Sequence, residues 1–220
     1  MIKLYDLCGK NNLRFSPPCW NVKLCLIHKN LNFETVPVRF SEKEKISFSG
    51  QKLVPILEHD KGFVCESWKI INWLDANYPD KKLFKNETSK NFSYFLYLWT
   101  ARQLLPVLFK IIAHEIPNVL EDEDVNYYIK TREERIKGPI TKFKTNISEL
   151  INEFRKLVSP IRKIIEKNGY IAGQTPGIED YLFYGNFKWV YSCSSCNLLE
   201  TDDAIYNWFK ALSEIADKTK

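Results

Sequence analysis

The chain has 220 residues, 45% hydrophobic and 27% charged, a composition typical of a globular protein that buries a full core without disulfide bonds. Its formal net charge of +5 is small and evenly spread, which excludes the basic footprint of a nucleic-acid-binding protein. Uninterrupted apolar stretches fall far short of the roughly 20 residues of a membrane span, so we expect no membrane partner. The six cysteines and a start that lacks the pattern of an export signal predict free thiols in the cytoplasm.

The first eighty residues alternate between strand and helix patterns. Residues 2–7 alternate as a strand does, residues 16–31 place apolar side chains at helical spacing, and residues 33–40 are again β-rich. Two short β-rich runs flank a turn at residues 59–62, and a second helix follows over residues 67–77. This order predicts a βαβ unit, a helical connection and a ββα unit.

Strand patterns nearly vanish after about residue 80. Helical patterns cover residues 90–114, 123–157, 161–167, 178–191 and 203–216, with a kink expected at Pro106 and a break near Gly138-Pro139. We therefore predict two domains, an α/β domain over residues 1–79 and an all-helical domain over residues 88–220.

The segment Ser16-Pro17-Pro18-Cys19 marks the start of the first predicted helix. Because serine is a preferred N-cap and proline is favoured at the first helical position, the simplest interpretation is that Ser16 only caps the helix. A helix N-terminus also carries a partial positive charge and unpaired N–H donors, which stabilise an anion such as a thiolate. A serine hydroxyl at that point can donate a hydrogen bond to the thiolate of a bound ligand, so both interpretations stay open.

Two later segments have a similar pair of interpretations. Pro55 lies at the start of a predicted strand, either as an edge-strand proline or as a cis-proline that turns the backbone of Val54 outward to pair with an extended ligand. Glu66-Ser67 lies at the next strand-to-helix junction, where Ser67 is expected as the N-cap. That junction is either a plain cap or a second helix end that binds a carboxylate.

In this order and at this spacing, these segments resemble the thioredoxin-like domain of the cytosolic glutathione transferases. The segments that carry the resemblance are Ser16–Trp20, Leu53–Leu57, Glu66–Leu74 and, in the helical half, Tyr170–Asp180. The last is similar to the family's helix-capping motif, with Gly177 where the family has Ser or Thr, so one reciprocal bond with Asp180 is lost. The resemblance covers nearly the whole chain and implies the glutathione transferase fold, a thioredoxin-like domain followed by a helical bundle.

The resemblance implies that Ser16 is the catalytic serine, whose hydroxyl hydrogen-bonds the sulfur of glutathione and favours the thiolate. Phe15–Trp20 and Phe48–Pro55 look most like the serine-type branch, which includes bacterial β-etherases and related fungal enzymes. The implied reaction is attack of the thiolate on an electrophilic carbon, such as an aryl ether or halide carbon. The family also implies a homodimer.

The resemblance assigns further residues to glutathione, the co-substrate. The backbone of Val54 holds the cysteinyl part, Pro55 is the cis-proline, and the pair Glu66-Ser67 grips the γ-glutamyl end. Lys52 and Arg39 are both candidates for binding the glycine carboxylate.

We expect the second substrate, a hydrophobic electrophile, to lie between the domains. The candidate lining residues are on the first long helix of the second half: Tyr94, Tyr97, Leu98, Trp99 and Arg102. Aromatic residues at this spacing are also typical of a plain core. No metal is implied, because His28, His59 and His114 are scattered without ligand spacing.

Two other functions are alternatives to the transferase. One is a carrier that binds hydrophobic ligands in the same interdomain space without catalysis. The other is a thiol oxidoreductase that uses Cys19, which we expect to be packed in the core and therefore poorly reactive. Cys193 and Cys196 are expected to form a solvent-side pair of thiols.

Overall fold

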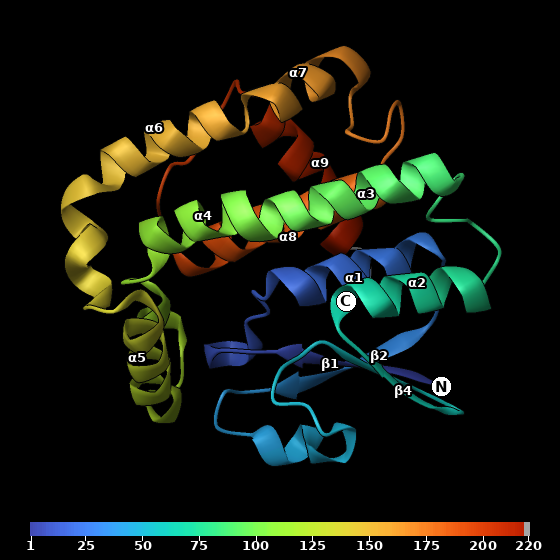
Figure 1. Ribbon diagram of the computed structural model, residues 1–220, viewed down its shortest axis with the longest axis horizontal. Helices are drawn as coiled ribbons and strands as arrows, with labels where there is room; N and C mark the ends of the chain where they lie inside the picture. Colours follow the sequence, from blue (N-terminus) through green and yellow to red (C-terminus); the bar gives the residue numbers. More distant parts are fainter. Residues whose placement is uncertain (218–220) are drawn as a thin grey trace.

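The computed structural model describes residues 1–217, and its first part is built on a four-stranded sheet (Figure 1). The strands are β1 (Ile2–Leu7), β2 (Phe33–Val38), β3 (Ile56–His59) and β4 (Gly62–Cys65), in the spatial order β2-β1-β3-β4. β1 runs parallel to β2 and antiparallel to β3, and β4 completes an antiparallel hairpin with β3. A parallel pair requires a crossover, which α1 (Pro17–His28) supplies, so the predicted βαβ and ββα units are confirmed.

Helices α1 and α2 (Ser67–Asn77) cover one face of the sheet (Figure 1). On the opposite side of α1 lies α8 (Ile178–Cys193), so α1 is apolar on both faces. A Cβ atom placed on Gly185 of α8 would lie 2.6 Å from the backbone oxygen of Pro17 and 2.7 Å from Oδ1 of Asn21. Glycine is therefore needed at position 185 for the two helices to pack this closely.

The second part is helical, as predicted. Its helices are α3 (Glu87–Trp99), α4 (Leu105–Ile112), α5 (Asp122–Ile136), α6 (Ile147–Leu157), α7 (Ser159–Asn168), α8 and α9 (Ala204–Asp217), and its short turns are η4 (Ile116–Val119) and η5 (Ile140–Asn146). In the first part, η1 (Lys10–Asn12) and η2 (Lys43–Ser49) are short 3₁₀ turns. The last three residues of the predicted helical domain lie outside the described range.

Where the sequence predicts a kink, the residues just before Pro106 form a π-helical turn, η3 (Thr100–Leu104), between α3 and α4. Proline lacks an N–H donor and its ring collides with the carbonyl four residues earlier in a regular α-helix, and a π turn relieves such a conflict. By length and composition alone, the continuous helix Glu87–Ile112 could cross a membrane, although its uninterrupted apolar stretches are short. In this structure it packs against α8 and α6.

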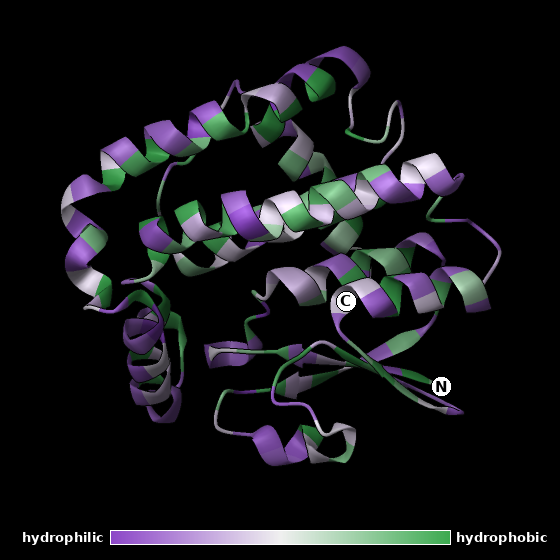
Figure 2. Ribbon diagram, viewed as in Figure 1, coloured by the Kyte–Doolittle hydropathy of each residue, from purple (hydrophilic) through white to green (hydrophobic). Residues whose placement is uncertain are grey.

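Helix α5 is largely hydrophilic and lies beside the end of the sheet (Figures 1 and 2). Two hydrogen bonds attach it to the loop after β2. The backbone N–H of Ser41 donates to Oδ1 of Asp124 at 2.7 Å, and Lys43 Nζ donates to the hydroxyl of Tyr127 at 2.8 Å. These contacts hold α5 against that loop, and Tyr128 and Arg132 of α5 line a common cavity with Pro17 and Pro18 at the start of α1.

Candidate active site

Ser16 occupies the N-cap position of α1, with extended backbone angles and two prolines directly after it. Its carbonyl accepts a hydrogen bond from the backbone N–H of Trp20 at 3.0 Å, but its side chain caps no backbone N–H of the helix. The side-chain capping role, the simpler interpretation of the sequence, is therefore absent. The residue is 7% exposed and its hydroxyl is within hydrogen-bonding reach of the buried Cys19 thiol.

Two adjacent cavities meet at Ser16. The first, of about 190 Å³, lies between the loop after β2, the segment before β3 and α5. The second, of about 270 Å³, lies between the start of α1, α4 and α5. Ser16 and Arg132 line both, so a ligand in either cavity passes the same hydroxyl and the same guanidinium.

The first cavity brings together four of the residues assigned to glutathione: Ser16, Arg39, Lys52 and Val54. The peptide bond between Val54 and Pro55 is cis, as predicted. No Asp or Glu is among the residues that line this cavity, whereas Lys43 and Arg132 add to its positive charge. The cavity therefore suits an anionic ligand.

The two candidate cations for the glycine carboxylate differ in availability. Arg39 pairs with Glu42 at 3.3 Å and with Glu123 at 3.7 Å, and the Glu42 carboxylate raises the pKa of Arg39. Lys52 is exposed and forms no ion pair with any residue of the described chain. Its ammonium group is thus the one free to receive a ligand carboxylate.

Glu66 and Ser67 do not line this cavity. The expectation that Ser67 is the N-cap of α2 is wrong: the N-cap is Glu66, at φ 70°, and Ser67 is the first helical residue. Positive φ is uncommon for a residue other than glycine and is often found at functional sites. The Glu66 carboxylate pairs with Lys69 at 2.7 Å, while the buried Ser67 hydroxyl lies 3.5 Å from that of Tyr97.

The second cavity is mostly apolar, and its apolar wall includes Phe15, Leu105, Phe109, Ile116, Tyr128 and Trp189. The five residues expected to line the second-substrate space line neither cavity. Tyr94 and Tyr97 instead pack against Trp68, with ring centroids 5.0 and 5.4 Å apart. The sequence signal for the part of the wall that α5 contributes is the spacing of Tyr128, Arg132 and Arg135, which puts one aromatic and two cationic side chains on one face of the helix.

The cysteines offer no exposed, activated thiolate near Ser16. Cys19 is fully buried, as expected; burial raises its pKa well above the ordinary value, the charge of Asp6 raises it further, and the hydrogen bond with Ser16 lowers it. Cys193 is buried, which corrects the expectation of a solvent-side pair, and Cys196 is half-buried. Within residues 1–217, no three or more His, Cys, Asp or Glu side chains come together as a metal site.

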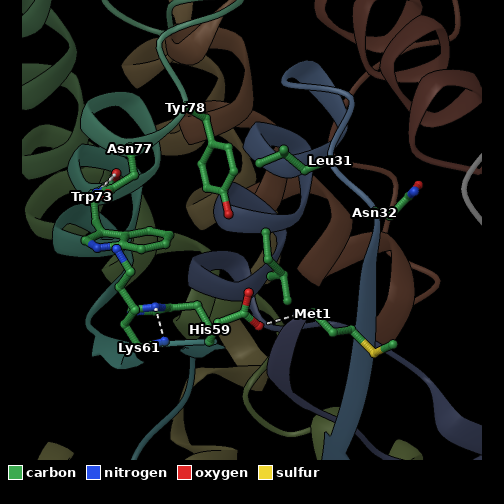
Figure 3. A pocket seen from close by; sticks show the side chains of 10 residues that line it. Met1, Leu31, Asn32, His59, Lys61, Trp73, Asn77 and Tyr78 are labelled. Atoms are coloured by element: carbon green, nitrogen blue, oxygen red, sulfur yellow. Dashed lines mark hydrogen bonds and ion pairs between the residues drawn. The ribbon is translucent and has the colours of Figure 1, made fainter.

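A larger hollow, of about 380 Å³, lies at the opposite end of the sheet (Figure 3). Its wall includes His59 stacked on Trp73 at a centroid distance of 4.2 Å, and the N-terminal amine paired with Asp60. None of the residues assigned to glutathione lines it. We therefore place the candidate site at the two cavities beside Ser16.

Comparisons with known proteins identify the family to which both halves of the chain are similar. The family model "Glutathione S-transferase, N-terminal domain" matches residues 12–82, and the model "Glutathione S-transferase, C-terminal domain" matches residues 92–209. Glutathione S-transferase omega-1 of Mus musculus is 22% identical over 210 residues, which cover 92% of this chain and 75% of that protein.

Solved structures share the fold. The crystal structure of a glutathione transferase from Phanerochaete chrysosporium superposes with a TM-score of 0.83 at 18% identity, covering 97% of this chain and 96% of that one. A glutathione S-transferase of Ceriporiopsis subvermispora, in complex with glutathione, gives 0.79 at 18% identity, covering 100% of this chain and 97% of that one. Because the two family models together span both the sheet and the helical half, the chain belongs to the glutathione S-transferase family.

Proposed function

We propose that this chain is a serine-type glutathione transferase that conjugates glutathione to a hydrophobic, aromatic electrophile. The observation that carries the proposal is the position of Ser16: it lies at the start of a helix, caps no N–H group with its side chain, and lines both cavities. A hydroxyl between two cavities can act on a sulfur bound in one while a carbon is presented from the other.

Glutathione supplies the nucleophile, a thiol whose ordinary pKa is about 8.5. In the proposed mechanism, the Ser16 hydroxyl donates a hydrogen bond to the sulfur, and the N-terminal end of α1 favours the negative charge, so the thiolate is populated at neutral pH. A sulfur–carbon bond then forms while the bond from that carbon to a halide or aryl ether oxygen breaks, and the leaving group takes the electron pair. The apolar wall of the second cavity holds the ring and excludes water.

The remaining binding roles follow the family resemblance and the charge of the first cavity. Lys52, with Arg39 beside it, is proposed to bind the glycine carboxylate, and the Val54 backbone next to Pro55 the cysteinyl part. Glu66 and Ser67 are proposed for the γ-glutamyl end, which would extend beyond the first cavity. We further propose that the protein acts as a homodimer in the cytoplasm.

Replacing Ser16 by alanine tests the catalytic role. A hydrogen bond to a charged group contributes about 1.5–3 kcal/mol, so S16A should lower turnover about 10- to 100-fold while glutathione still binds. Steady-state kinetics with glutathione against aryl halides, aryl ethers and a disulfide in parallel, together with calorimetric titration of glutathione, measure both quantities. The exposed Ser47→Ala variant is the matched control. Unchanged turnover in S16A would exclude the role assigned to Ser16.

A further inference from the structure

The walls of the two cavities carry charge of one sign. Five basic side chains line them, Arg39, Lys43, Lys52, Arg132 and Arg135, and no acidic side chain of the described chain does. Three of these cations belong to the first cavity alone. Arg132 lines both cavities and Arg135 lines only the second. The second cavity therefore has a cationic edge that the carboxylates of glutathione do not account for.

Arg132 is held in place by aromatic rings rather than by an acid. Its guanidinium carbon lies 5.1 Å from the ring centroid of Phe40 and 5.0 Å from that of Tyr128. One N–H donates to Oγ1 of Thr131 at 2.8 Å, and no Asp or Glu within residues 1–217 forms an ion pair with it. A guanidinium has five N–H donors in a rigid planar fork, so the single bond to Thr131 leaves most of the hydrogen-bonding capacity of Arg132 unused within the described residues.

The partial burial of Arg132 indicates that its guanidinium favours an anionic ligand. Arg132 is half-buried, and desolvation lowers its pKa. A partly desolvated charge without a counter-ion is unfavourable, and an incoming carboxylate removes that penalty through two parallel hydrogen bonds. By contrast, Arg39 already has Glu42 and Glu123 as partners.

Arg135 extends the same feature along α5. It lies three residues after Arg132, on the same face of the helix, and its guanidinium carbon is 5.0 Å from the ring centroid of Phe109 in the second cavity. No acidic residue in the described part of the chain pairs with it either. The apolar wall and this pair of arginines together fit an aromatic ring with a carboxylate at one end.

We propose that the second cavity takes aromatic electrophiles that carry a carboxylate, with the ring against Phe109 and Tyr128 and the carboxylate on Arg132, assisted by Arg135. This inference rests on the proposed transferase function. The carboxylate does not react: the sulfur–carbon bond forms and the carbon–halogen bond breaks at another ring position, and the halide leaves with the electron pair.

A matched pair of substrates tests the proposal, namely a chlorodinitrobenzoate and its methyl ester, which differ in charge but undergo the same substitution. In R132Q, kcat/KM for the benzoate should fall about 10- to 100-fold, the loss expected for a charge-assisted hydrogen bond, while the value for the ester should change less than about threefold. R135Q should give a smaller loss with the same preference, and R132K should retain part of the benzoate activity.

The control variant is Lys130→Gln, which removes an exposed cation from the same helix outside both cavities. It should leave both substrates within about twofold of the unmodified protein. An equal loss for benzoate and ester in R132Q, or a loss confined to KM for glutathione, would overturn the proposal, because Arg132 would then serve the fold or the first cavity.

Binding of an unreactive pair separates this inference from the proposed function. Dinitrobenzoate and its methyl ester have no leaving group, so their affinity for the intact protein, measured by calorimetry, does not depend on catalysis. Tighter binding of the benzoate, lost in R132Q and kept in K130Q, supports the anionic cavity even if no turnover is found. Equal affinities of both compounds would overturn it even if the enzyme is active.

Discussion

At the scale of single residues, His28 joins the two halves of the molecule. Its Nδ1 lies 2.9 Å from the hydroxyl of Tyr181 on α8, and the two rings meet edge to face. Burial lowers the pKa of His28, and the charges of Lys29 and Lys81 lower it further. The folded protein therefore holds this ring neutral at a pH where a free histidine is already partly charged.

This shift predicts an acid sensitivity with a defined sign. The unfolded chain takes up a proton near pH 6.5 and the folded chain only at lower pH, so the unfolded state binds more protons in between. The free energy of unfolding should fall as the pH drops below about 6.5, by at most about 1.4 kcal/mol per pH unit, and level off below the folded pKa.

Urea unfolding of H28Q and of the unmodified protein between about pH 5 and 7 measures how the free energy of unfolding depends on pH. The free energy of unfolding of H28Q should change less steeply with pH than that of the unmodified protein. His114, whose pKa burial also lowers, should contribute separately, so the effects of H28Q and H114Q should add. An unchanged slope in H28Q would contradict the assignment.

Glu66 shows which residue-level features the sequence does not encode locally. The dipeptide Glu66-Ser67 correctly marks a strand-to-helix junction. The backbone of Glu66, however, takes a positive φ, and the N-cap is Glu66 rather than Ser67. Glutamate has no intrinsic preference for this conformation, so its neighbours impose it. The position of the Ser16 hydroxyl is different: the Ser-Pro pattern predicts the helix start, yet only the structure shows that the side chain caps nothing.

At the scale of elements, the start of α8 is organised around one buried carboxylate. Asp180 accepts hydrogen bonds from the backbone N–H groups of Ile171, Ala172 and Gly177, at 2.8, 3.1 and 3.0 Å, and from Trp208 Nε1 at 2.7 Å. Gly177 has no side chain that could accept a bond from the backbone N–H of Asp180, as expected for glycine at this position. Four donors on one carboxylate connect the loop before α8, the cap and α9 despite that loss.

The structure also gives a reason for glycine at position 177. A Cβ atom there would lie 2.7 Å from Cβ of Ala172, closer than real Cβ atoms approach. G177S should therefore destabilise the protein by about 1–3 kcal/mol through overpacking, although serine is a favourable cap. In an A172G background the same change should cost less than about 1 kcal/mol, because the obstructing methyl group is gone.

Urea unfolding of the four proteins in this double-mutant cycle measures the coupling between the two positions. A G177S variant as stable as the unmodified protein, or a cost that persists in A172G, would show that Ala172 is not the reason for the glycine.

Helix α5 explains why the second cavity could not be located from the sequence. Its composition is hydrophilic, so the pattern suggests a solvated helix, and the aromatic residues of α3 are then the more obvious pocket candidates. The contacts that bring α5 to the site are long-range: Lys43 and Tyr127 are 84 residues apart in the chain. Local periodicity fixes the faces of a helix but not its distant neighbours.

At the scale of the whole molecule, the order of elements followed directly from the sequence. The period of two over β1 and the helical period over α1, α2 and the later helices match the observed elements closely. What could not be predicted is how the halves meet. That depends on Gly185, which in the sequence is one glycine inside an apolar helix and in the structure lies against the first turn of α1.

Replacing Gly185 by alanine tests this contact. The added methyl group would meet the backbone oxygen of Pro17, the residue after Ser16, so the start of α1 must move. We expect a loss of about 1–3 kcal/mol in unfolding free energy and a fall in turnover of at least several-fold. Gly138→Ala, in a loop where the nearest side-chain atom is 3.4 Å from the new Cβ, is the control.

A double-mutant cycle that combines G185A with S16A distinguishes displacement of the Ser16 hydroxyl from a general loss of structure. If G185A acts by moving Ser16, its effect on turnover should nearly vanish in the S16A background, while its effect on stability persists. Equal effects on turnover in both backgrounds would contradict that route.

The contact between Gly185 and Pro17 also constrains how this protein can be recombined with its relatives. A chimera that keeps residues 1–79 and takes its helical part from another transferase inherits a new surface beneath the first turn of α1. Such a hybrid should place Ser16 correctly only if the incoming helix brings glycine to the position opposite Pro17, so compatibility between the halves depends on a residue that touches neither substrate.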